Sequence, residues 1–161
     1  MTAYLLWKTV HVIAATIVLG TGVGIAFFCW FGTRHALARR DIHSLRTILH
    51  FTVIADAAFT APAVVVQLIS GLALLSYLGW SAVSPWALAV FTLFVVVGAC
   101  WLPVVWIQIQ LDRTAHAVKS TAFLPPRFHV LLRAWFALGI PAFAGVLALV
   151  WLMVARPLAV N

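Results

Sequence analysis

The residue of this chain best placed for chemistry is a histidine inside a long apolar segment. His11 follows Trp7 and Lys8 in the first such segment. At helical spacing, its face also carries small residues, among them Ala15, Val18, Gly22 and Cys29. An imidazole beside small residues leaves space for a flat macrocycle whose iron binds the imidazole nitrogen. We therefore predict that His11 is the axial ligand of a haem b. The alternative is a histidine that is only hydrogen-bonded, because Gln67, Ser70 and Thr92 are expected at the same depth.

The other histidines fall near the ends of the apolar segments. His35, His43 and His116 lie in the connections, and we expect His50 and His129 to begin the second and fourth helices in one layer. This pair is the alternative set of haem ligands, or else these histidines contact lipid phosphates. No compact spacing such as H-x₃-H is present, so we predict no metal beyond a haem iron.

Asp56 is the only acid well inside a predicted helix, and an intramembrane carboxylate is a functional candidate by default. Helical spacing places Thr60, Gln67 and Ser70 on its stripe. Arg133 is expected at a similar depth in the fourth helix, which predicts an ion pair with Asp56. Gln108 on the third helix points to the same layer. We predict a polar intramembrane network of Asp56, Gln67, Gln108 and Arg133, which is either a proton path or a latch that fixes helix register.

The elements that must position these residues are four apolar stretches, at about 4–32, 49–78, 86–111 and 130–155. Each is long enough for the ~20 residues that a helix needs to cross a bilayer. Backbone N–H and C=O groups cannot stay unpaired in lipid, and the strands of a membrane barrel are shorter and alternate between apolar and polar residues. These stretches are therefore predicted to be helices. Residues 1–161 are therefore predicted to form a single all-α domain, a four-transmembrane-helix bundle with up-down-up-down topology.

Charge predicts the orientation of this bundle. Hydrophobic residues make up 65% of the chain and charged residues 8%, and the formal net charge is +7. The basic residues gather in the first and third connections, whereas the second, around 76–85, has none. The positive-inside rule then places both termini on the outer side. The basic excess is explained by topology and anionic lipid, so the lipid bilayer is the predicted partner and no nucleic acid is needed.

Several motifs resemble an uncharacterised family of bacterial four-helix integral membrane proteins of unknown function. They are Lys8 with His11, 55–63, Gln67 with Ser70 and Gly71, 99–106, 135–143 and 153–157. The Lys-x-x-His start is more distantly similar to the haem-binding membrane protoporphyrinogen oxidase and copper-resistance membrane protein groups. The resemblance to the oxidase group implies that His11 binds haem. It also implies a multi-pass protein of the bacterial cytoplasmic membrane.

Three classes of function follow from these features. The leading hypothesis is a haem b-binding redox protein that exchanges electrons with a quinone or another redox partner. The second is a non-redox accessory or assembly subunit of a larger membrane complex. The third is a small transporter that uses the stripe from Asp56 to Gln67 and acts as a homodimer, for which Gly20, Gly22 and Gly24 offer a close-packing face.

Overall fold

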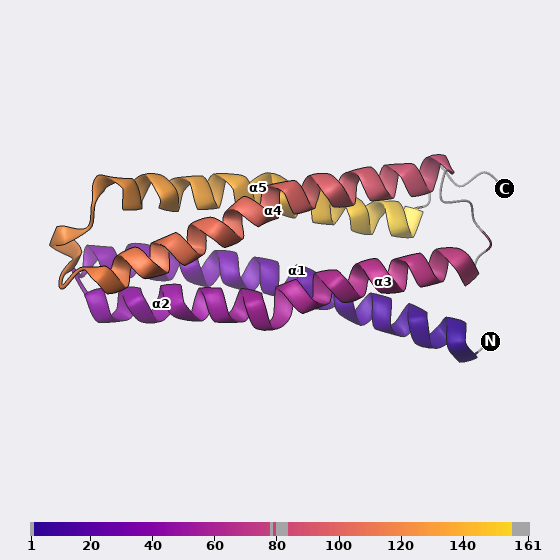
Figure 1. The fold of residues 1–161 in the computed structure, drawn as a ribbon, viewed down its shortest axis with the longest axis horizontal. Coiled ribbons are helices and arrows are strands. Elements are labelled where there is room, and N and C mark those ends of the chain that lie inside the picture. Colours follow the sequence, from indigo (N-terminus) through magenta and orange to yellow (C-terminus); the bar gives the residue numbers. More distant parts are fainter. Residues whose placement is uncertain (1, 78, 80–83, 156–161) are drawn as a thin grey trace.

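Four long helical rods alternate in direction, as the apolar stretches predict (Figure 1). The computed structural model describes residues 2–77, 79 and 84–155. The first rod is α1 (Thr2–Ala38), and the second is α2 (Ile42–Ala55), the π-helix η1 (Asp56–Thr60) and α3 (Ala61–Tyr77). The third is α4 (Pro85–Ala117) and the fourth is α5 (Pro126–Ala155), with the short 3₁₀ helix η2 (Thr121–Phe123) between them. The all-α, four-helix prediction is confirmed, and no described residue is in a strand.

The helices run further into the basic side than the apolar stretches do. The first connection is reduced to Arg39, Arg40 and Asp41 because polar residues continue both helices. Arg40 has a φ of 55° and ends α1 in the left-handed conformation usually taken by glycine. Asp41 then caps α2 by accepting the backbone N–H groups of His43 and Ser44. The Ser44 hydroxyl also donates to Asp41 and, with these N–H groups, holds the pKa of its carboxyl below the usual range.

A π-helix interrupts the second rod at Asp56–Thr60, directly before Pro62. Proline lacks an N–H and its ring crowds the carbonyl four residues earlier, so a regular α-turn cannot form there. The Ala61 N–H instead reaches back to the Asp56 carbonyl. Asp56 and Thr60 are both buried by this turn, at 6% exposure each.

The rods form two helix pairs that meet at the basic end and separate toward the other end (Figure 1). One pair is α4 with α5, and the other is α1 with the second rod. The packed core lies at the basic end and includes Leu45, Leu49, Leu111, Phe128 and Leu132. Arg46 joins the pairs there, because its guanidinium donates to the Ala115 and Val118 carbonyls at the end of α4.

The α4–α5 pair depends on a close approach at Gly145. A Cβ at this buried position would collide with the Val97 side chain, whereas a Cβ at Gly139 on the same helix would meet nothing within 4 Å. We expect Gly145→Ala to destabilise the protein by about 1–3 kcal/mol through overpacking. Gly139→Ala is the matched control and should be neutral or stabilising by up to about 1 kcal/mol. Thermal unfolding in detergent measures both, and equal effects would contradict this packing.

Candidate ligand cavity

A cavity of about 980 Å³ lies between the two helix pairs. Its walls come from α1, η1, α3, α4 and α5 and are mostly apolar side chains. Volumes near the upper end of the small-molecule range suit a ligand of cofactor size, and a few polar groups would orient it. The polar side chains in the lining fall into an outer group around His11 and Gln67 and an inner group around Asp56 and Gln108.

The hydrogen bonds of the outer group decide which nitrogen of the His11 ring carries the proton. The Gln67 amide nitrogen lies 3.0 Å from His11 Nε2 and donates to it. His11 is therefore protonated on Nδ1, which donates to the Ser70 hydroxyl at 2.8 Å. The Ser70 hydroxyl donates in turn to the Val66 carbonyl at 2.6 Å. Gly71 lets the ring lie against α3, because a Cβ there would stand 3.2 Å from His11 Cε1.

These contacts match the hydrogen-bonded alternative predicted for His11. Gln67 and Ser70 are its partners, as their position on one stripe suggested, whereas Thr92 is exposed on α4. The Gln67 carbonyl oxygen is buried and has no hydrogen-bond partner in the described structure. Since a buried, unpaired amide oxygen costs free energy, the Gln67 side chain is not held at its optimum.

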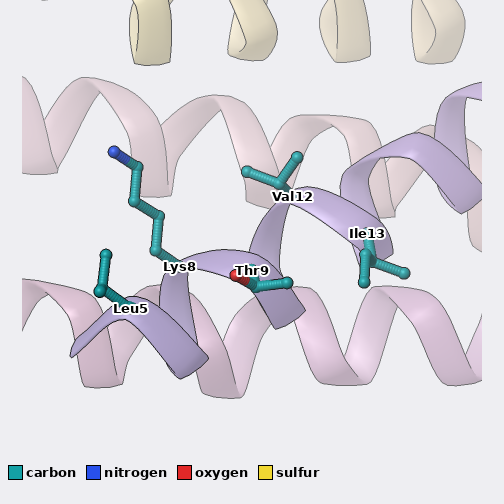
Figure 2. A pocket seen from close by; sticks show the side chains of 5 residues that line it. All are labelled: Leu5, Lys8, Thr9, Val12 and Ile13. Atoms are coloured by element: carbon teal, nitrogen blue, oxygen red, sulfur yellow. The ribbon is translucent and has the colours of Figure 1, made fainter. Parts of the chain in front are cut away.

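Lys8 lies one helical turn outward from His11, beside the cavity. It lines a smaller pocket of about 370 Å³ together with Leu5, Thr9, Val12 and Ile13. Val12 also lines the large cavity, and Figure 2 shows Lys8 and Val12 projecting from the same side of α1. The Lys8 ammonium therefore offers a positive charge near the rim of the cavity.

The inner group surrounds the Asp56 carboxylate with neutral donors. Gln108 Nε2 donates to one carboxylate oxygen at 2.8 Å, and Trp101 Nε1 donates to the other at 3.4 Å. Trp135 Nε1 donates to the Gln108 carbonyl oxygen at 3.3 Å, which fixes the amide orientation. One turn further, Thr60 donates to the Thr21 hydroxyl at 3.0 Å and ties η1 to α1.

The predicted network of four residues is wrong in two respects. Gln67 belongs to the outer group with His11, and Arg133 belongs to neither group. Arg133 is exposed on α5, and no ion pair joins it to Asp56 within 2–77, 79 and 84–155. The physical reason is the rotation of α5, which buries Phe128, Leu132 and Trp135 and turns Arg133 away from the bundle.

His50 and His129 do not form the predicted pair. Because α2 begins at Ile42, His50 lies two turns inside it and its Nδ1 is 3.7 Å from Asp112 on α4. His116 Nδ1 is 3.2 Å from the same carboxylate, with its ring centroid 6.0 Å from that of His50. His129 is exposed near the start of α5, and its ring contacts Phe128 edge-on. The described residues contain no group of three or more His, Cys, Asp or Glu that could hold a metal ion.

Sequence reasoning missed the two indole donors. Trp101 and Trp135, which lie well inside α4 and α5, direct their indole N–H groups toward Asp56 and Gln108. Their depth, which separates them from the tryptophans at the segment ends, was the available signal. Cys29 is buried and Cys100 is partly buried, and the two are not joined in a disulfide.

Comparison with known families gives one match over nearly the whole chain. Residues 5–157 match the family described as "Predicted integral membrane protein (DUF2269)". No curated protein and no solved structure matches the chain.

Proposed function

The chain belongs to the DUF2269 family of predicted integral membrane proteins, and we propose that it binds haem b in this cavity and carries electrons within the bacterial cytoplasmic membrane. It is a multi-pass membrane protein, with four helices long and apolar enough to cross a bilayer. The basic residues at the end where α1 meets α2 support an orientation with that end in the cytoplasm and both termini outside.

The observation that carries this proposal is the position of His11. It is the only histidine among the described residues that line the cavity. Its Nδ1–H is held by Ser70, and that hydrogen bond selects the tautomer with a lone pair on Nε2. Metal-bound histidines are oriented in this way by a partner on the other ring nitrogen.

The residues around His11 fit a haem at one axial position. Nε2 is covered by the Gln67 amide, which must turn aside for iron to bind. Gln67 is a flexible side chain whose carbonyl oxygen lacks a partner, so its present position is a weak barrier. The apolar walls suit the macrocycle, and Lys8 at the rim would pair with a propionate.

A bound haem supplies one-electron transfer between its ferric and ferrous states. We place its electron partner in the membrane, as a quinone or another redox carrier. Met153 on α5 is the only other side chain in the described cavity lining that is of a type able to ligate haem iron, since the lining holds no second histidine and no cysteine. Gly20 and Gly24 on α1 are exposed with open space around them, which supports a homodimer face.

The absorbance spectrum of the purified protein tests this function. We expect protein isolated in mild detergent from cells grown with ample haem precursor to show a Soret band with about one haem per chain, because the cavity offers one ligating histidine. Reduction by dithionite should shift that band. A colourless protein would contradict the proposal and favour an accessory subunit or a transporter.

A further inference from the structure

We infer that the inner end of the cavity binds a ring hydroxyl of a hydroquinone, with Asp56 as the group that accepts its proton. This inference rests on the proposed haem function and names the electron donor for it. It assigns a role to the polar group that haem ligation leaves unused, namely Asp56, Gln108, Trp101 and Trp135.

Asp56 is held in place as an acceptor without a counter-charge. Its carboxylate is buried and accepts hydrogen bonds from the N–H groups of Gln108 and Trp101. Both donors are neutral, so neither supplies a positive charge beside it. Among the described residues of the lining it is the only acid, and none is lysine or arginine. A buried carboxylate without a cation is costly, so a ligand that brings a proton donor is favoured there.

The ligand that complements this site is an apolar ring with a hydroxyl group. Each Asp56 oxygen has one N–H donor and keeps acceptor capacity for another. The indoles of Trp101 and Trp135 stand beside the carboxylate in an otherwise apolar cavity. A quinone carbonyl would be repelled by the ionised carboxylate, but a quinol O–H would donate to it.

The π-turn provides the placement of Asp56. Asp56 and Thr60 are buried on the same side of the second rod, and Thr60 is fixed to Thr21 on α1. Asp56 and Gln67 are separated by eleven residues, which is roughly 16 Å along a helix at 1.5 Å per residue. The cavity thus has two polar ends, one for the iron ligand and one for proton exchange.

The redox step balances as follows. Oxidation of one hydroquinone to the quinone releases two electrons and two protons. Haem held by His11 would take these two electrons one at a time, and a downstream one-electron carrier would reoxidise it between the two transfers. The hydroxyl protons pass to the Asp56 carboxylate one at a time and leave it before the next transfer. In the reverse direction, protonated Asp56 returns a proton to the quinone.

Binding is tested without haem through tryptophan fluorescence. A short-chain quinol and its quinone should quench Trp101 and Trp135, and Trp101→Phe and Trp135→Phe assign the signal. We expect Asp56→Asn to weaken quinol binding by about tenfold or more, because a charge-assisted hydrogen bond is lost. Asp56→Glu should retain most of the binding. Asp112→Asn, which changes an acid on α4 that does not line the cavity, should have no effect. Equal binding by wild type and Asp56→Asn would overturn the inference.

Electron transfer is tested in the haem-loaded protein. The short-chain quinol should reduce the wild type, and Asp56→Asn should lose most of that rate. Dithionite, which needs no site, should reduce both proteins equally. Weakened binding with an unchanged quinol rate would refute the proton-accepting role. A colourless protein that still binds quinol through Asp56 would refute the haem function and leave the binding site standing.

Discussion

Replacement of His11 by Ala is expected to abolish the Soret band or shift it to the blue. The variant removes the only cavity-lining histidine of the described chain, so no imidazole remains for the iron. His50→Ala and His129→Ala are the matched controls and should keep the band, because both side chains are exposed outside the cavity. Absorbance of the three purified variants makes the comparison.

The opposite pattern would relocate the cofactor. A band that survives in His11→Ala but disappears in His50→Ala would place the haem at the basic end, near His116 and Asp112. His50 and the exposed His129 lie on α2 and α5, which are not principal packing partners, so the fold gives no support to a haem site made of those two residues.

The second large effect is expected at Gln108. Its amide donates to Asp56 and accepts from Trp135, so Gln108→Leu leaves one oxygen of a buried carboxylate and the Trp135 indole N–H without a partner. Trp101 still donates to the other carboxylate oxygen. Loss of a buried hydrogen bond to a charged group costs about 1.5–3 kcal/mol. Gln110→Leu, two residues along the same helix, is the control and should cost far less. Unfolding free energies in detergent provide the measurement.

The double variant tests the coupling. Asp56→Leu combined with Gln108→Leu should recover much of the loss, because no charge then remains to be satisfied. Additive losses in the double variant would show that the two side chains do not depend on each other. Such additivity would also contradict the view that Gln108 holds the Asp56 carboxylate in position to accept a proton.

The number of helices could be predicted because bilayer thickness fixes the length of an apolar span. Their ends could not, because a helix continues through polar residues until a backbone feature stops it. Here that feature is Arg40 in the left-handed conformation followed by the Asp41 cap. The prediction that His50 begins a helix failed for this reason, since α2 starts two turns earlier.

Depth along a helix was predictable from sequence, but rotation about its axis was not. His11, Gln67 and Ser70 were correctly matched in depth and do meet. Arg133 was also matched in depth to Asp56 but points away, since each residue turns the helix by roughly 100°. Packing of Phe128 and Trp135 decides that rotation, and it depends on the whole bundle.

The most direct test of haem at His11 is chemical rescue. His11→Gly removes the imidazole and leaves a space beside Gly71, at a helix cost of roughly 1 kcal/mol. If His11 ligates the iron, this variant should be purified without a Soret band, and added imidazole together with haem should restore it. Imidazole should have no such effect on His11→Leu, which fills the space. A His11→Gly protein that keeps its wild-type Soret band without imidazole would contradict the assignment of His11 as the haem ligand.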